Sequence, residues 1–327
     1  MPVSRTTERT GGGRRRSAVV GLLAVAAVLA GCTSSGTGAP KASPDATRPS
    51  TTATTLPTTT TVAPTTTTTT EQPGWIQVAT VDGDIAVDQQ PFTEPDGHLI
   101  TVVRFRAPHV SYALHVGSAD PPRGQATIGP DAGSAVGPDE SPLLLAAFNG
   151  GFEAKDGGGG FEIDGQTLVP LQAGLASLVI DADGSAHVGI WGQGLPAPGE
   201  QVVSVRQNLG PLVAGGQSSA DVDTIGAWGS TLGGGSVVAR SSLGEDAAGD
   251  LLYAAGMEAV PADLAGALVS AGAITGMQLD INPEWVQLAF APAPGGPLST
   301  AIPGQNRPAD QYQVGWTRDF VTVLARN

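Results

Sequence analysis

The stretch Leu143 to Phe152 reads LLLAAFNGGF, and the rest of the chain is best interpreted around it. Its apolar residues, 143–148, form a run short enough for a strand buried on both faces, and Gly150 and Gly151 end that run abruptly. Asn149 therefore comes where a buried strand reaches the surface. Two adjacent glycines lack the Cβ atoms that keep a ligand away from the backbone, and they allow positive φ angles that turn amide groups toward one point. The stretch predicts either a ligand site or a tight turn after a core strand.

Residues 1–31 are typical of an export signal. Three arginines precede an apolar stretch, residues 18–30, that is too short to span a bilayer. The sequence Leu29 to Cys32, LAGC, resembles the lipobox of bacterial lipoproteins, in which the cysteine is lipidated and becomes the mature N-terminus. The resemblance implies that Cys32 is a lipid anchor at the extracytoplasmic face of the cell membrane, and an uncleaved anchor or an ordinary signal peptide is the alternative. Cys32 is also the only cysteine, so the stability of the exported protein must come from a sizeable core.

Residues 32–73 are predicted to be a disordered linker. Threonine, proline, serine and alanine dominate this segment, and residues 65–70 are an unbroken run of threonine. Such a composition has almost nothing to bury and does not offset the entropy lost on ordering. Threonine and proline together are typical of an extended, O-glycosylated stalk, and about forty residues reach on the order of 100 Å when nearly extended.

Residues 74–327 have the length of one domain at the upper end of the usual size range or of two small ones, and we predict one globular domain. They carry nine basic and twenty-seven acidic side chains, which gives a net charge near −18. This charge argues against nucleic acid or anionic lipid as the ligand of the domain surface. An acidic surface is also what keeps a protein soluble, and we expect a monomer.

The domain is predicted to belong to the α+β class, with strand-rich mixed sheets and few helices. Segments rich in β-branched and aromatic residues alternate with Asp-Gly pairs at 82–83, 96–97 and 164–165, which predicts hairpins. Residues 261–271 carry the one convincing helix pattern, with Pro261 in the first turn, Asp263 near the positive end of the dipole and Gly272 as its stop. A strand over 273–279 follows and ends at Asp280.

No metal ion or other cofactor is expected from the sequence. The chain has four histidines, His98, His109, His115 and His187. They lack the close spacing of metal sites. The turn at residues 181–184, DADG, resembles the start of a calcium loop, but the remaining ligand positions are missing and DxDG between strands is typical of a simple turn. The glycines at 157–160 lack the spacing of a phosphate-binding loop, and no nucleophile elbow of the esterase type is present.

Four segments together resemble the phosphodiester glycosidase family, and the resemblance covers most of the domain. Residues 146–152, AAFNGGF, resemble the family's alanine-isoleucine-asparagine-glycine-glycine-phenylalanine-phenylalanine signature. Residues 211–216, PLVAGG, fall where the family has a proline or glycine, a leucine, a valine and a turn glycine. Arg240 resembles the arginine that the family places before a glycine-containing strand. Residues 277–280, MQLD, resemble the segment leading into the family's leucine-aspartate-glycine-glycine-glycine-serine motif. The resemblance implies removal of N-acetylglucosamine from a phosphodiester.

Two departures from the family pattern bear on this chemistry. Glu153 stands where a second phenylalanine is usual, and residues 281–285, INPEW, replace the glycine-rich turn and the serine. Glycines and a hydroxyl would present donors to a phosphate, whereas Pro283 has no amide hydrogen. Either Asn282, Glu284 and Trp285 form a different sugar site, or the domain keeps the scaffold without this chemistry.

The candidate site residues follow from the chemistry and the resemblance together. Cleavage between a sugar and a phosphate needs a carboxylate near the anomeric carbon or one that activates water, and it needs donors for the phosphate charge. Asp280 and Glu284 are the candidate catalytic carboxylates, and the structural alternative for Asp280 is a turn cap. The candidate substrate-binding residues are Asn149, Gly150, Gly151, Arg240, Asn282 and Trp285. In this set Arg240 is the phosphate clamp, Asn149 binds a sugar hydroxyl or acetamido group, and Trp285 stacks on a sugar ring.

The sequence therefore predicts an exported hydrolase that acts on a sugar-1-phosphodiester in cell-envelope glycans, with N-acetylglucosamine as the candidate sugar. The alternative is a non-catalytic lipoprotein that binds envelope glycans on the same scaffold. The expected partners are the glycan and, through Cys32, the membrane, with no nucleic acid. We expect the segments of Asn149, Arg240 and Asp280 to converge on one site, because each lies at the end of a glycine-flanked strand.

Overall fold

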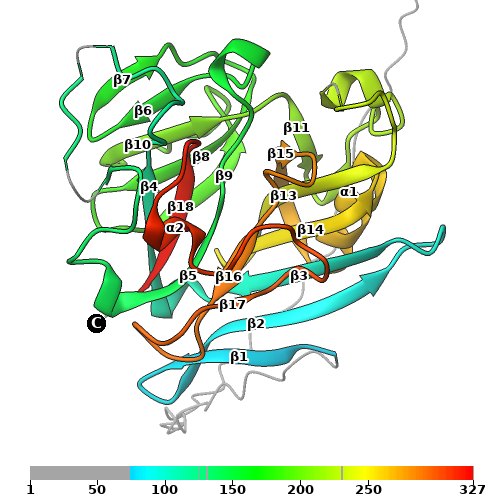
Figure 1. Ribbon diagram of the computed structural model, residues 1–327. Coiled ribbons are helices and arrows are strands. Elements are labelled where there is room, and N and C mark those ends of the chain that lie inside the picture. The colour runs from blue at the N-terminus through cyan, green and yellow to red at the C-terminus, as the bar shows by residue number, and fades with distance from the viewer. Residues whose placement is uncertain (1–73, 125, 130–131, 230, 327) are drawn as a thin grey trace, which may run out of the picture. The chain divides into compact units, whose positions relative to one another are not determined.

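The computed structural model describes residues 74–327 except positions 125, 130–131, 230 and 327 (Figure 1). The predictions for the export signal, for Cys32 and for the linker concern residues outside this range. Among the helices that are described, none has the length and apolar character needed to cross a membrane.

Three sheets account for the strands of the domain (Figure 1). The eight-stranded sheet has the order β1 (Ile76–Val81), β2 (Asp84–Thr93), β3 (Leu99–Phe105), β14 (Leu251–Ala259), β13 (Val238–Asp246), β15 (Ala273–Ile281), β11 (Pro211–Ala214) and β12 (Gln217–Ser218). One five-stranded sheet has the order β7 (Gln166–Val169), β6 (Phe161–Ile163), β10 (Val202–Gln207), β8 (Ala176–Asp181) and β9 (Ala186–Ile190). The other has the order β17 (Ser299–Thr300), β16 (Leu288–Phe290), β5 (Leu144–Asn149), β18 (Phe320–Ala325) and β4 (Val110–His115).

The strand-rich architecture with few helices is confirmed, but the prediction of mixed sheets is wrong. Every pairing between named strands in the described part of the chain is antiparallel, for example β1 with β2, β6 with β7, and β13 with β14. For the hairpin pairs the physical reason is the short connection, because a tight turn joins only antiparallel strands. The domain is mostly β, and its helical share is small.

The helices are α1 (Pro261–Ser270) and the short α2 (Gln311–Val314), with 3-10 turns at η1 (Ala107–His109), η3 (Ser141–Leu143), η4 (Ala154–Asp156) and η5 (Ile225–Trp228). The pattern predicted for α1 is confirmed to within one residue. The Asp263 carboxylate accepts the backbone N–H of Val260 at 2.7 Å, and Gly272 adopts a φ of 103° just after the helix. Leu264 and Leu268 are fully buried in a cluster between α1 and the eight-stranded sheet.

The strand predicted from the opening stretch is β5, and all six of its residues are buried. It lies between β16 and β18, so both of its edges are hydrogen-bonded as well. Its Phe148 stacks on Phe105 of β3 with ring centroids 5.9 Å apart and packs on Tyr253 of β14 at 5.2 Å. Burial of one such aromatic ring contributes about 1.5–3 kcal/mol. The run is apolar throughout because both faces of β5 are covered: Phe148 packs against β3 and β14, and Ala147 packs in a separate cluster with Tyr312 and Trp316.

Candidate active site

A pocket of about 470 Å³ lies beside the end of β15, and its size is that of a small-molecule site. Three residues that were predicted from the sequence line it, namely Asp280, Asn282 and Trp285. Glu153, Lys155 and Arg318 line it too.

Asp280 is the residue whose electrostatics stand out in this pocket. It lies within β15 rather than after it, and its carboxylate is buried. Its Oδ2 is 2.7 Å from a guanidinium nitrogen of Arg318, and its Oδ1 accepts the N–H of Ile281 at 2.9 Å. Burial raises the pKa of Asp280 to about 7, and Arg318 opposes this shift. A carboxyl that exchanges its proton near neutral pH suits general acid or base catalysis.

Arg318 is a residue of the site that the sequence did not reveal. Besides Asp280, it donates to the carbonyl of Gly151 at 3.2 Å, and its guanidinium lies 5.0 Å above the ring of Trp285. Arg318 comes just before β18, and β18 pairs with β5 so that Phe320 lies opposite Asn149. This register brings Arg318 to the glycine pair across 167 residues of sequence. The only local signal was an arginine next to an aspartate at the start of the last strand.

Glu153 supplies a second carboxylate to the same pocket. It is 2.7 Å from the ammonium of Lys155 and 3.8 Å from Arg318. The hydrogen bond from Lys155 is the largest cause that lowers the pKa of Glu153, and Arg318 adds to it. Glu153 therefore stays ionised under conditions in which Asp280 is partly protonated. Two carboxyl groups whose environments separate their pKa values are the usual basis for assigning an acid and a base.

Glu284, the second predicted catalytic carboxylate, does not line the pocket. Its side chain is 47% exposed, forms an ion pair with Arg307 at 2.6 Å and accepts from Asn306 at 3.1 Å. Asn282 and Trp285 lie on either side of it in sequence but face the pocket. Asn282 adopts a left-handed φ of 76° where the chain turns after β15, and its carbonyl accepts the N–H of Trp285 at 3.1 Å.

Arg240, the predicted phosphate clamp, is fully buried and does not line the pocket. Arg240 of β13 lies directly opposite Ile281 of β15, so the two side chains are on the same face of the sheet. The side chain of the neighbouring Asp280 is on the other face. Its guanidinium donates to the carbonyl of Trp228 at 3.2 Å and to Oε1 of Gln278 at 3.3 Å, with no carboxylate partner among the described residues. Burial lowers its pKa to about 10. Arg240 therefore does not fit the role of a phosphate clamp in this pocket.

Asn149 is 2% exposed and uses its amide inside the protein. It donates to Oγ of Ser241 and to the carbonyl of Gly150, both at 2.9 Å, and it accepts from the hydroxyl of Tyr253 at 2.7 Å and the N–H of Gln287 at 3.2 Å. With these partners the side chain has no capacity left for a sugar. It does have a positioning role, because Ser241 in turn donates to the carbonyl of Asp280 at 2.8 Å. The segments of Asn149, Arg240 and Asp280 thus meet around Ser241, but of these three residues only Asp280 lines the pocket.

Gly150 and Gly151 are required by a buried ion pair rather than by a ligand. A Cβ on Gly150 would overlap Oδ2 of Asp319, and a Cβ on Gly151 would lie 2.9 Å from a guanidinium nitrogen of Arg206. Asp319 and Arg206 are both buried and are 2.7 Å apart. Neither glycine adopts a positive φ. The expectation that they turn amides toward a ligand is corrected, since the N–H of Gly151 points to Asp319 at 3.2 Å.

Comparisons with known proteins identify no family for this chain. No family model matches it, and no curated protein matches it. Solved structures that are similar in part include the catalytic domain of zebrafish N-acetylglucosamine-1-phosphodiester alpha-N-acetylglucosaminidase, auto-inhibited by its pro-peptide. The identity is 13% and the TM-score 0.47, over 77% of this chain and 88% of that one. They also include a hypothetical protein from Synechocystis (14% identity, TM-score 0.43, 74% of this chain and 62% of that one) and a putative exported protein from Burkholderia pseudomallei (11% identity, TM-score 0.30, 69% and 74%). At these identities and TM-scores the similarities do not indicate a function for this chain.

Proposed function

We propose that the protein is a hydrolase that cleaves a sugar-1-phosphodiester of cell-envelope glycans, with N-acetylglucosamine as the candidate sugar. The observation that supports this proposal is the carboxyl pair in the pocket. Asp280 has its pKa raised to about 7, Glu153 has its pKa lowered, and both contact Arg318. Hydrolysis of a glycosidic bond needs one protonated and one ionised carboxyl group on either side of the anomeric carbon.

In this proposal each group has one chemical task. Asp280, when protonated, donates its proton to the phosphate oxygen that leaves the sugar. Glu153, as the carboxylate, activates water or attacks the anomeric carbon. Arg318 and Lys155 balance the charge of the phosphate, since charge-assisted hydrogen bonds to phosphate are about twice as strong as neutral ones. Trp285 provides an aromatic face for the sugar ring.

The second candidate function is that of a glycan-binding lipoprotein without catalysis. The turn after Asp280 favours it, because Pro283 offers no amide hydrogen where the resembled family has glycines and a serine. In that case Arg318 and Asp280 would hold each other as a structural pair, and Trp285 with its polar neighbours would bind the glycan.

Turnover by the purified protein decides between these two functions. We would incubate it with a panel of phosphodiester-linked and chromogenic N-acetylglucosamine substrates and measure kcat and KM. Asp280→Asn and Glu153→Gln keep the shape of each side chain, and each is expected to lower kcat by about 10²-fold or more, as loss of a general acid or base does. Glu284→Gln is the matched control and is expected to change kcat less than about twofold, because this carboxylate lies outside the pocket.

The outcomes are distinct. Saturable glycan binding without turnover, unchanged by Asp280→Asn, would establish the binding module instead. A loss with Glu284→Gln as large as the loss with Asp280→Asn would refute the assignment of the carboxyl pair.

We also propose that residues 1–31 are a lipoprotein signal, that Cys32 carries the lipid, and that residues 32–73 hold the domain of residues 74–327 away from the outer face of the cell membrane. The support is the sequence LAGC at 29–32 and the composition of the threonine-rich segment.

A further inference from the structure

A second cluster of side chains, one imidazole and two carboxylates, lies beside the sheet that contains β8, β9 and β10. It consists of Asp181 at the end of β8, His187 in β9 and Glu200 shortly before β10. One ligand atom of each lies within 4.8 Å of the others. The cluster shares no residue with the proposed active site.

Strand register explains why these three residues meet. Val179 lies directly opposite His187, and Asp181, two residues after Val179, points to the same face of the sheet. Asp181 in turn pairs with Val202 of β10, and Glu200 comes two residues before Val202. The neighbouring strands β9 and β8 therefore present an imidazole and a carboxylate on one face, and the loop that leads into β10 brings the carboxylate of Glu200 to them. The spacings in sequence match no metal motif, which is why the histidine pattern gave no sign of the cluster.

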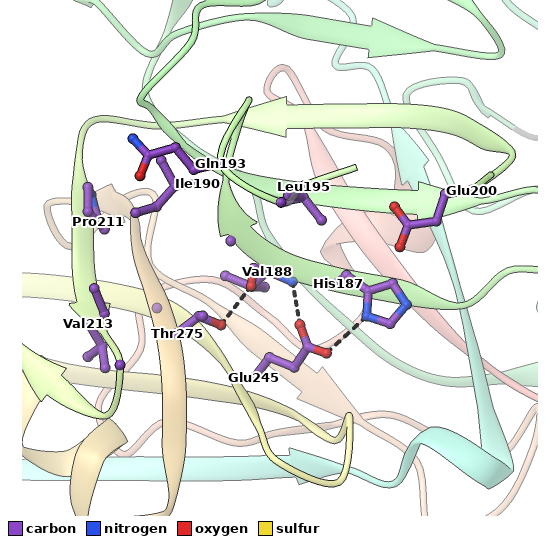
Figure 2. Close-up of a pocket in the computed structure, with 15 residues that line it drawn as sticks. His187, Val188, Ile190, Gln193, Leu195, Glu200, Pro211, Val213, Glu245 and Thr275 are labelled. Carbon is purple, nitrogen blue, oxygen red and sulfur yellow. Dashed lines mark hydrogen bonds and ion pairs between the residues drawn. The ribbon is translucent and has the colours of Figure 1, made fainter. Parts of the chain in front are cut away.

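The imidazole of His187 is held in the orientation that a metal ligand needs. Its Nδ1 is 2.9 Å from Oε1 of Glu245 on β13, and Oε2 of Glu245 accepts the N–H of Val188 at 2.7 Å. Figure 2 shows Glu245 and Glu200 on different sides of the imidazole ring. A carboxylate that accepts from Nδ1 leaves Nε2 free to bind a cation, and histidine ligands of metals nearly always have such a partner.

The two carboxylates of the cluster have oxygen atoms available. Oδ1 of Asp181 is buried and has no hydrogen-bond partner among the described residues. Oε2 of Glu200 accepts the N–H of Ala197 at 2.6 Å, so its Oε1 is left for a ligand. A buried carboxylate oxygen without a partner is costly, and a bound cation would remove that cost. On the same face, Val179 lies directly opposite His187 and pairs with Val205, and both valines are buried.

We propose that Asp181, His187 and Glu200 bind one divalent transition metal ion, with zinc as the favoured metal and Glu245 as the residue that positions the imidazole. One nitrogen and two oxygen donors suit zinc, whereas calcium and magnesium take oxygen ligands. Ligand atoms around zinc lie about 3.4 Å apart when each bond is about 2.1 Å, so small side-chain rotations complete the site. Three protein ligands leave a fourth position for water, next to a cavity of about 340 Å³ that His187 and Glu200 line (Figure 2).

A comparable cluster elsewhere in the domain provides the control. Asp96, His98 and Asp263 also lie within 4.8 Å of one another. There the Nδ1 of His98 contacts both carboxylates, at 2.9 Å to Asp96 and 2.8 Å to Asp263, and Asp263 also accepts the N–H of Val260. The imidazole of His98 and the two carboxylates are therefore already paired with one another at the start of α1. They should not bind zinc with comparable affinity.

The test is a calorimetric titration of the purified full-length, metal-free chain with ZnCl₂, repeated with CaCl₂ and MgCl₂. We expect one zinc ion per chain and binding at least about 100-fold weaker for calcium and magnesium. Glu200→Gln and His187→Ala should each abolish that binding event, Glu245→Gln should weaken it about 10- to 100-fold, and His98→Ala should leave it unchanged.

Thermal unfolding of each variant in EDTA shows whether it is folded without metal. If His187→Ala is unfolded in EDTA, zinc binding by Glu200→Gln decides the question, because this substitution keeps the shape of a half-buried side chain. Absence of saturable zinc binding by the unmodified chain overturns the proposal. Binding that persists in folded Glu200→Gln and is lost in His98→Ala also overturns it, and equal affinity for calcium overturns the choice of a transition metal.

Discussion

Substitution of Gly150 by alanine tests why this chain carries two glycines after β5. The new Cβ would overlap Oδ2 of Asp319, the oxygen that Arg206 contacts at 2.7 Å and to which the N–H of Gly151 points at 3.2 Å. Either Asp319 must leave Arg206, or β5 and β18 must separate. Both changes disturb a charge pair that is fully enclosed between strands.

The size of the effect follows from the contacts of the pair. Breaking a buried ion pair costs about 3–5 kcal/mol, and forcing an extra methyl into a packed core costs about 1–3 kcal/mol. Arg206 keeps its hydrogen bonds to the carbonyls of Phe152, Gly158 and Gln207, each at 2.6 Å, so its charge would not be left without partners. We therefore expect Gly150→Ala to lower the free energy of unfolding by about 3 kcal/mol, near the bottom of the range for the ion pair.

The assay is urea unfolding followed by tryptophan fluorescence, with the free-energy difference taken from the shift in midpoint at constant slope. Gly210→Ala is the matched control, because a Cβ there would meet nothing within 4 Å and Gly210 has no positive φ. It should change stability by less than about 1 kcal/mol. If Gly150→Ala were as harmless as the control and instead abolished glycan binding, the glycine pair would be a ligand cradle after all.

Three further predictions concern the proposed hydrolase. Its kcat should fall as pH rises through about 7, because the general acid Asp280 then loses its proton. Arg318→Gln should move this fall to higher pH, because it removes the cation that opposes the raised pKa of Asp280. A pH–rate profile of each protein checks both expectations. Lys155→Met should raise KM for a phosphodiester about tenfold, equivalent to about 1.4 kcal/mol, whereas Arg240→Met should leave KM unchanged in steady-state kinetics of the folded variant. Cys32→Ala should release the protein from membranes or leave it unprocessed, and membrane retention with an unchanged precursor pattern in fractionated cells would contradict the lipid anchor.

Local sequence patterns were sufficient to predict the elements whose signals come from neighbouring residues. The apolar run before Asn149 is the buried strand β5, and Pro261, Asp263 and Gly272 bound α1 almost where predicted. Such patterns succeed because burial on both faces, helix capping and helix termination each depend on only a few consecutive residues. For the same reason Asp280, Asn282 and Trp285 could be grouped in advance, since they follow one another along a single strand and its exit.

The sequence by itself thus determined a strand-rich domain, its buried central strand and one half of the candidate pocket. The tertiary structure alone decided the other half, because β18 pairs with β5 and carries Arg318 to Asp280 across a long stretch of chain. It also showed that the amide of Asn149 and the glycine pair are engaged inside the protein, and that the pKa of Asp280 is raised. Strand register, ion pairing and desolvation are set by residues that are distant in sequence, so no local pattern of side chains reports them.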